Sequence, residues 1–291
     1  MLKLVLPKGS LEDATIRLFD EADLSIQRRS ARDYKADIDD ARIESVRFLR
    51  PQEIPHYVAD GLFDAGITGR DWIEETGADV VSVTELRYSK STSRPVLLVL
   101  AVAESSPYKK PSDLAPGIRV STEYPRITSR YFEKLGIEVK IQLSYGATEA
   151  KVPDIVDAIV DNTETGASLR AAGVRIIDTL LESYPELIVN ASAWQDLSKR
   201  KALEEIAVLL RGALDARGRV LIKLNVSSEK LKDVVEVLPS MKSPTVSTLH
   251  GGKYFAVETV VPKSGVNELI PLLKDRGAED IVEMPISKIV L

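Results

Sequence analysis

The residues best suited to chemistry lie between positions 157 and 169, where the sequence reads DAIVDNTETGASL. Asp161 follows an apolar run at 158–160, and the small and polar residues after it lead to a predicted helix start at 169–172. A strand that enters a helix through such a loop leaves backbone N–H groups for an anion, and Gly166 lets a phosphate approach closely. Asp161 can accept hydrogen bonds from hydroxyl groups. The pattern therefore predicts a site for a sugar phosphate; the alternative is an ordinary turn between a strand and a helix.

Two further strand–loop–helix units precede this stretch and could frame such a site. The first joins a strand at 2–6 to a helix at 11–21 that Ser10 is expected to cap, and Lys8 in its loop either meets an anion or is solvated. The second reads FDAGITGRDW at 63–72, and its Asp71 either contacts a ligand or only caps the helix. Its order of residues is similar to that of the stretch after position 157. This similarity predicts two similar lobes with a ligand between them.

The spacing of apolar residues predicts how these units are arranged along the chain. Strands and helices alternate up to about residue 177, with a crossing between lobes at 89–95, a helix at 110–114 and a strand at 175–177, which predicts an α/β fold with largely parallel sheets. A long amphipathic helix at 197–216 leads to a third unit. Its expected elements are a strand at 220–226, a helix at 228–238, strands at 245–249 and 254–261, a helix at 266–275 and a strand at 280–284. This order is ferredoxin-like and suits an effector-binding module or an assembly surface.

Composition excludes several classes of protein. The 291-residue chain has no cysteine and only two histidines, His56 and His250, which excludes disulfides, cysteine nucleophiles, zinc–thiolate centres and a histidine-rich metal site. A net charge of −5 gives no overall attraction to nucleic acid or to an anionic membrane. The apolar run at 95–103 is too short to span a bilayer, and the N-terminal run is too short for a secretory signal. We therefore expect a cytoplasmic protein without nucleic-acid or membrane partners.

Several motifs together resemble one enzyme family. They are LPKGSL at 6–11, FLRPQEIPHYVADG at 48–61, DAGITGRDW at 64–72, STEYP at 121–125 and the stretch at 157–169. In this order they resemble ATP phosphoribosyltransferase, and SPTVSTL at 243–249 is similar to the regulatory domain of its long form. The resemblance implies an α/β catalytic core of two lobes, like the type II periplasmic binding proteins, followed by a ferredoxin-like, ACT-like regulatory domain. The implied boundaries are 1–90 and 180–213 for the first lobe, 91–179 for the second lobe and 214–291 for the regulatory domain.

The resemblance also implies an activity and a set of site residues. The family transfers a phosphoribosyl group from phosphoribosyl pyrophosphate to an adenine ring nitrogen of ATP, releases pyrophosphate in this first step of histidine biosynthesis, and is inhibited by histidine. The implied sugar-donor site comprises Asp161, Thr163, Glu164, Thr165, Gly166, Ala167 and Ser168. The implied catalytic residues are Lys8 and either Asp157 or Asp161 on the ribose hydroxyls, with Asp161 favoured because it adjoins the loop. The implied nucleotide contacts are Arg50, Asp71 and Glu149.

The chain departs from the family pattern at three of these positions. Ser168 stands where a threonine is usual but keeps a hydroxyl, whereas Glu164 has the wrong charge for a phosphate and should either point away or reach Mg²⁺. In the third unit the implied histidine contacts are Asn225 and Thr245, and Asn225 stands where relatives often carry an acid. The resemblance further implies Mg²⁺ as cofactor and a homo-oligomer, dimeric or hexameric. The alternative function is a two-lobe binding protein or an amino-acid-sensing protein without catalysis.

Overall fold

The computed structural model describes residues 1–30, 32–90, 94–239, 241 and 243–291. The chain divides into two compact units, Met1–Ala207 and Val208–Leu291. The division falls within helix α7 (Leu197–Ala216), and the boundary expected between residues 213 and 214 lies in the same helix. Among the described residues, no helix is long and apolar enough to cross a membrane.

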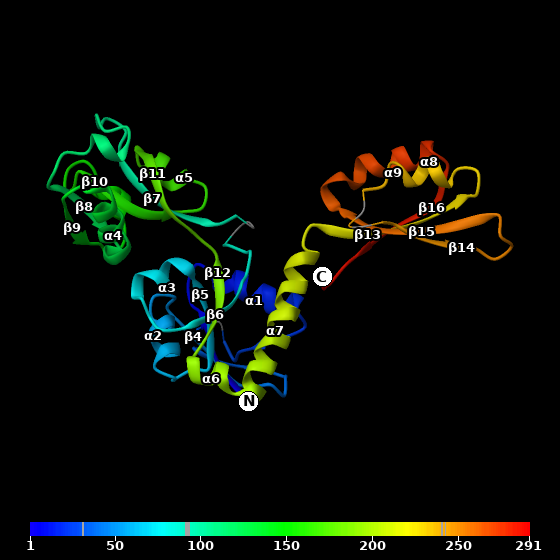
Figure 1. Cartoon of the computed structure of the whole chain (residues 1–291), viewed down its shortest axis with the longest axis horizontal. Helices are drawn as coiled ribbons and strands as arrows, with labels where there is room; N and C mark the ends of the chain where they lie inside the picture. Colours follow the sequence, from blue (N-terminus) through cyan, green and yellow to red (C-terminus); the bar gives the residue numbers. More distant parts are fainter. Residues whose placement is uncertain (31, 91–93, 240, 242) are drawn as a thin grey trace. The chain divides into compact units, whose positions relative to one another are not determined.

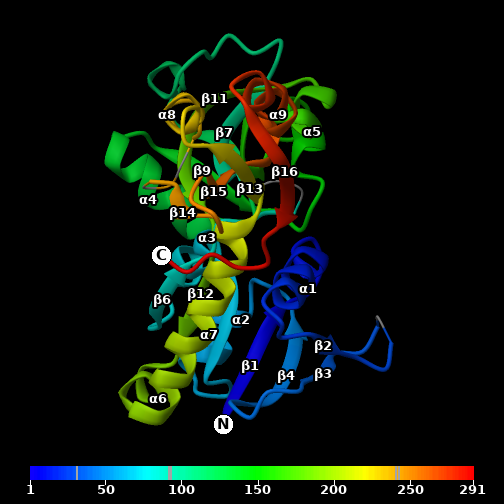
Figure 2. The ribbon, with the colours of Figure 1, turned by 90° about the vertical axis from the view of Figure 1, so that its right-hand side faces the viewer.

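The first lobe of the first unit is built on a seven-stranded sheet. Its strands are β1 (Leu2–Pro7), β2 (Ile26–Gln27), β3 (Lys35–Ile38), β4 (Ile43–Leu49), β5 (Ala65–Gly69), β6 (Val81–Glu85) and β12 (Pro185–Val189). They are ordered β2-β3-β4-β1-β5-β12-β6, and Figure 2 shows the first four side by side. Strands β4, β1 and β5 are parallel, so the loops after them, which lead toward α1 (Glu12–Glu21), α2 (Ile54–Ala59) and α3 (Arg70–Thr76), open at one edge of the sheet.

The second lobe of the same unit is built on a five-stranded sheet, drawn mainly in green in Figure 1. Its strands are β7 (Val96–Ala103), β8 (Ile118–Thr122), β9 (Val139–Leu143), β10 (Ala158–Thr163) and β11 (Val174–Ser183), in the order β11-β7-β10-β8-β9. Strands β10, β8 and β9 are parallel, whereas β7 runs antiparallel to both of its neighbours. The remaining elements are η1 (Pro111–Asp113), α4 (Pro125–Leu135), η2 (Thr148–Lys151) and α5 (Ala167–Ala171).

The chain passes between the two lobes twice, once after β6 and once between β11 and β12. The crossing expected at 89–95 includes residues 91–93, which lie outside the described residues. After the return, α6 (Ala191–Gln195) begins with an N-cap at Asn190, whose side chain accepts from the backbone N–H groups of Ser192 and Ala193. The expected two-lobe α/β architecture is confirmed. The expectation of largely parallel sheets was wrong, because β12 runs antiparallel to β5 and β6, as β7 does to its neighbours β10 and β11, so both sheets are mixed.

Several predicted element boundaries were wrong, each because tertiary pairing or local capping decided them. The strand expected at 158–160 continues to Thr163, and the strand expected at 175–177 spans Val174–Ser183, because both pair along β7. The helices expected at 110–114 and 228–238 are reduced to η1 and to α8 (Leu231–Val235). Ser10 does not cap the first helix, since the N-cap position falls on Leu11 and has no side-chain hydrogen bond.

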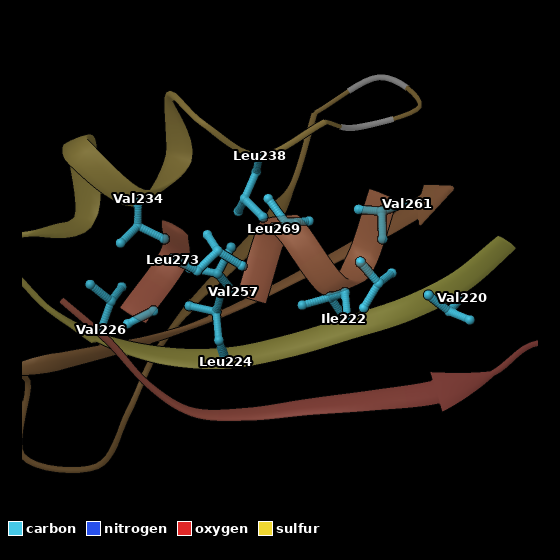
Figure 3. Close-up of a cluster of buried hydrophobic side chains, with 12 residues drawn as sticks. Val220, Ile222, Leu224, Val226, Val234, Leu238, Val257, Val261, Leu269 and Leu273 are labelled. Atoms are coloured by element: carbon cyan, nitrogen blue, oxygen red, sulfur yellow. The ribbon is translucent and has the colours of Figure 1, made fainter. Parts of the chain in front are cut away.

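The second unit confirms the ferredoxin-like order. Its elements are β13 (Arg219–Ser227), α8, β14 (Thr245–Thr248), β15 (Tyr254–Pro262), η3 (Lys263–Gly265), α9 (Val266–Asp275) and β16 (Ala278–Pro285). The strands form an antiparallel sheet in the order β14-β15-β13-β16. Figure 3 shows Ile222 and Leu224 of β13 pointing toward Leu269 and Leu273 of α9, and these side chains belong to one buried cluster. The opposite face of the sheet, which carries Asn225, is therefore the one that α9 leaves uncovered.

Candidate active site

Three parallel strands of the second lobe end at one edge and bring polar side chains together there. Ser121 on β8 pairs with Gln142 on β9 and with Ile159 on β10. Two residues further along each strand come Glu123, Ser144 and Asp161. Because side chains alternate along a strand, these three follow on the same face as Ser121, at the carboxyl ends where α/β sheets hold ligands.

Helix η2 adds two charges of opposite sign to this edge. It supplies Glu149 and Lys151, and it contacts both β8 and β10. The Lys151 ammonium donates hydrogen bonds to the hydroxyls of Ser144 and Ser121. Glu149, implied by the resemblance as a nucleotide contact, lies in the same neighbourhood as Asp161, and Lys151 is a charge that the motifs did not reveal.

The Asp161 carboxyl at this edge has a pKa that its surroundings shift. Burial raises the pKa of its carboxyl to about 6, and the charges of Glu149 and Glu123 act in the same direction. The backbone N–H of Asn162, which donates to Asp161 Oδ1 at 2.8 Å, and the ammonium of Lys151 act against that rise. A half-buried carboxylate with several acceptor positions suits the hydroxyls of a sugar ring.

The loop after Asp161 has the expected conformation but is partly self-capped. Gly166 adopts φ +71°, and its N–H donates to Thr163 Oγ1 at 2.8 Å, while the N–H of Ala167 donates to Thr165 Oγ1 at 3.3 Å. We expected these amides to await an anion; instead the threonine hydroxyls satisfy them, as hydroxyl side chains often do in turns. The N–H groups of Ser168 and Leu169 begin α5 and have no partner within that helix.

Arg170 is a cation beside this loop that the motifs did not reveal. A methyl group on Gly166 would come within 2.7 Å of Arg170 Nη1, so the guanidinium lies against the turn. On the other side, Glu164 accepts a hydrogen bond from Ser89 Oγ at 2.7 Å. Sequence reasoning left Glu164 either pointing away or reaching a metal, and its described contact is this hydroxyl of the segment before β7.

Asp157 lies at the opposite end of β10 from Asp161. Both of its carboxylate oxygens accept from the Arg119 guanidinium, at 3.0 and 3.2 Å, and the backbone N–H of Arg119 donates at 2.8 Å. Hydrogen bonding to this guanidinium lowers the pKa of Asp157. The structure therefore does not bring Asp157 to the edge where Asp161 lies.

Asp71 links the two lobes through a buried chain of hydrogen bonds. It is 7% exposed and lies in the first turn of α3, where it accepts from Ser183 Oγ and from the Tyr124 hydroxyl, both at 2.8 Å. Burial raises the pKa of Asp71, and the two hydroxyls oppose that rise. Asn162 Nδ2 donates to the same tyrosine oxygen at 2.8 Å, and Trp72 stacks on the Tyr124 ring. This series of hydrogen bonds thus runs from Asp71 in the first lobe to Asn162, the residue next to Asp161.

A cavity of about 500 Å³ lies between the two lobes, which is large enough for a small ligand. The first lobe contributes Gly69, Asp71 and Trp72 to its lining. The second lobe contributes Thr165 and Ser168. The loop predicted to bind phosphate therefore opens into the cavity.

Lys8 and Arg50 lie in neighbouring loops beside residues that line this cavity. They follow the adjacent parallel strands β1 and β4, and a methyl group on Gly9 would lie 3.4 Å from Arg50 Nη1. Lys8 Nζ donates to Glu12 Oε1 at 2.9 Å, and Arg28 shares the same carboxylate. The neighbouring residues Ser10, Leu11 and Pro51 line the cavity itself. The structure thus gathers basic groups opposite the loop at 163–168.

Magnesium finds no ready-made set of ligands in the part of the chain that the structure describes. No group of three or more histidine, aspartate or glutamate side chains among the described residues could hold a metal ion. Mg²⁺ commonly binds through substrate phosphates and retains several waters. The donor set thus does not fit a resident magnesium centre.

The predicted effector residues both belong to the second unit and share one face of its sheet. Asn225 on β13 alternates with the buried Leu224 and Val226, and Thr245 on β14 pairs with Glu258 of β15. Asn225 Nδ2 donates to Asp280 Oδ2 at 2.9 Å. Asn225 thus has an acidic neighbour in β16, Asp280, which the motif did not reveal.

Comparisons with known proteins agree over the whole chain. The profile of ATP phosphoribosyltransferase matches residues 50–212, and that of the HisG C-terminal domain matches residues 216–288. A protein of Pelotomaculum thermopropionicum named ATP phosphoribosyltransferase is 47% identical over 99% of this chain and 99% of its own. A protein of Chlorobium phaeovibrioides with the same name is 48% identical over 100% of this chain and 98% of its own.

A solved structure extends the similarity to the fold. It is the ATP phosphoribosyl transferase (HisG:HisZ) complex from Thermotoga maritima, which has a TM-score of 0.60 and 25% identity. The alignment covers 72% of this chain and 96% of that one.

Proposed function

The chain belongs to the ATP phosphoribosyltransferase family, and we propose that its two lobes join phosphoribosyl pyrophosphate to ATP in the cavity between them. The enzyme catalyses the first step of histidine biosynthesis, in which an adenine ring nitrogen replaces pyrophosphate on the sugar. The resemblance inferred from the motifs is thereby confirmed. The observation that supports this placement of the site is the loop at 163–168, whose residues line the cavity and which follows Asp161 along β10.

The second lobe binds the sugar donor in this proposal. The phosphate of the sugar displaces the Thr163 and Thr165 hydroxyls from the loop amides and adds the N–H groups of Ser168 and Leu169. Arg170, against the turn, supplies positive charge. Ionised Asp161 accepts hydrogen bonds from the ribose hydroxyls, with Glu149 beside it. Asp157, tied to Arg119, supports β10 rather than the substrate.

The reaction needs no side-chain nucleophile. The adenine ring nitrogen donates its electron pair to C1 of the ribose, the C1–oxygen bond breaks, and that bond's electrons leave with pyrophosphate. Lys8 and Arg50 in the loops beside the cavity favour the departing negative charge. Holding both substrates in line contributes on the order of 7–11 kcal/mol at best, more than any single charged contact. Asp71 lines the cavity but its hydrogen bonds go to Tyr124 and Ser183, so it shapes the nucleotide side of the cleft.

Magnesium enters this proposal as part of the substrate. The family uses a metal ion in general, and the described residues of this chain do not provide a set of ligands for one. We place Mg²⁺ on the pyrophosphate group of the sugar donor, and no role of a protein residue depends on it.

The second unit is the proposed regulatory site. Histidine carries an ammonium group that Asp280 and Asn225 can receive, and Thr245 lies on the same face of the sheet. The Thermotoga relative is a HisG:HisZ complex; we propose that this chain forms a homo-oligomer, a dimer or a hexamer. Because ATP and phosphoribosyl pyrophosphate are intracellular metabolites, we place the enzyme in the cytoplasm.

The activity is tested by mixing the folded protein with ATP, phosphoribosyl pyrophosphate and Mg²⁺ and detecting phosphoribosyl-ATP by mass spectrometry. We expect product and pyrophosphate in equal amounts. Binding of both substrates without product would instead favour a sensing protein with an inactive cleft.

A further inference from the structure

The proposed function leaves one cation at the strand ends without a role. Lys151 is the last residue of η2, and its ammonium donates to Ser144 Oγ and, at 3.4 Å, to Ser121 Oγ. Both serines are buried, and Ser144 also exchanges a hydrogen bond of 2.8 Å with Thr148. The serines thus hold the ammonium at the sheet.

The register of the strands places this ammonium on the same face of the sheet as Asp161. Ser121 lies on β8 opposite Ile159 of β10, and Asp161 follows two residues later on the same face. Ser144 extends the ladder on the far side, where its N–H donates to the Thr122 carbonyl at 2.7 Å. The two serines therefore hold the Lys151 ammonium over the face from which Asp161 projects.

The surroundings of Asp161 contain more negative than positive charge. Glu149 comes from η2 and Glu123 from the end of β8, and both act against ionisation of Asp161. The neighbour on β7 is the apolar Val99, and on β10 itself the N–H of Asn162 donates to the carboxylate. Lys151 is the cation that acts in favour of the charged form.

We propose that Lys151 is a positioning residue whose ammonium keeps Asp161 ionised for the ribose hydroxyls of the sugar donor. The inference rests on the proposed function, in which ionised Asp161 receives those hydroxyls. Since the hydrogen bonds of Lys151 go to serine hydroxyls, it balances the charge while leaving the Asp161 oxygens available to substrate. A lysine acting as a compact point charge suits this role.

The test compares Lys151→Met with Lys151→Arg and with Lys140→Met, which removes an exposed lysine from the edge strand β9. The pH dependence of kcat/KM for phosphoribosyl pyrophosphate reports groups of the free enzyme. Loss of a nearby opposite charge raises a carboxyl pKa by about 1–3 pH units, and the low end applies because Lys151 bonds to the serines and not to Asp161. A rise of about one unit in Lys151→Met should lower kcat/KM about threefold at pH 6.5 and leave it nearly unchanged at pH 8.5. Lys151→Arg should restore most of the loss, and Lys140→Met should match the parent protein.

A second readout does not depend on activity. The carboxyl carbon of Asp161, assigned by its absence from Asp161→Asn, is titrated by NMR in the free protein, and Lys151→Met should move its midpoint upward by at least about one pH unit. An unchanged midpoint overturns the inference. A loss of kcat/KM that is equal at both pH values also overturns it, because it would place Lys151 on a substrate anion.

Two safeguards keep the test decisive. If Lys151→Met does not fold, Ser144→Ala removes one hydroxyl that anchors the ammonium and should move the midpoint in the same direction by less; no movement contradicts the inference. If the parent protein makes no product, the proposed function fails, while the NMR midpoint still decides whether Lys151 sustains the charge of Asp161.

Discussion

The two ends of strand β10 carry the same residue type in opposite electrostatic settings. At the amino end, the Asp157 carboxylate is bound by the Arg119 guanidinium and its pKa is lowered. At the carboxyl end, burial beside Glu149 and Glu123 raises the pKa of Asp161 to about 6. The first aspartate is satisfied by the protein, whereas the second is held in a state that a ligand can improve. The comparison teaches that charge, more than sequence spacing, separates a supporting acid from a substrate-binding one.

The largest expected effect is on enzymatic activity, which substitutions of the two aspartates should change to different extents. Asp161→Asn removes charged hydrogen bonds to the ribose hydroxyls, each worth about 1.5–3 kcal/mol, so turnover should fall on the order of 100-fold or more. Asp157→Asn, the matched control on the same strand, should keep most of the activity. Steady-state kinetics at pH 8 measures both, and an equal loss in the two variants would contradict the assignment.

The next effect concerns stability, which the substitutions of the two aspartates should change in opposite directions. A carboxyl group whose pKa is raised by folding makes the folded protein less stable as the pH rises from about 4 to about 6. The loss in free energy of unfolding remains above that pH. Asp161→Asn should therefore raise the free energy of unfolding at pH 7.5 by on the order of 2–3 kcal/mol, with little gain near pH 4. Asp157, whose pKa is lowered, should stabilise the fold above pH 4, so Asp157→Asn should be destabilising at pH 7.5. Urea unfolding at the two pH values checks both signs; destabilisation by Asp161→Asn at pH 7.5 would count against the account.

Tyr124→Phe sharpens the comparison by cutting the link between the charged end of β10 and the first lobe. The change removes hydrogen bonds to Asp71 and Asn162 but keeps the ring stacked on Trp72. Leaving the buried Asp71 with one partner fewer should lower stability by about 1–3 kcal/mol and raise the KM for the sugar donor. Tyr145→Phe, on a side chain 92% exposed, is the control. Equal unfolding midpoints for both variants would show that the chain of hydrogen bonds does not couple the lobes.

The smallest expected effect lies in the second unit. Asn225→Ala should leave turnover unchanged and weaken inhibition by histidine a few-fold, which is within the usual range of allosteric coupling, about 1–3 kcal/mol. Lys223→Met, on the same strand and face, is the control, since its partner Glu258 is itself a surface group. Histidine inhibition curves of the parent protein and the variant measure this change. An unchanged curve would mean that the effector site lies elsewhere.

The sequence predicted the elements that local pattern controls. The glycine turn in the loop at 163–168 and the ferredoxin-like order of the second unit follow from apolar period, glycine and strand ends. It could not predict groups that reach the site from elsewhere in the chain. The register of β8 and β10 brings Lys151 to the same face as Asp161. Tyr124 forms its hydrogen bond to Asp71 only once the lobes are folded. Nor could spacing separate Asp157 from Asp161, because their difference depends on Arg119, far away in sequence.

The most direct test is a crystal structure of the protein with phosphoribosyl pyrophosphate and Mg²⁺. The account predicts the sugar phosphate on the N–H groups at 166–169, with Thr163 and Thr165 hydroxyls released from Gly166 and Ala167, and the ribose hydroxyls on Asp161. A donor bound elsewhere in the cavity, with both threonine caps intact and Asp161 away from the sugar, would contradict it.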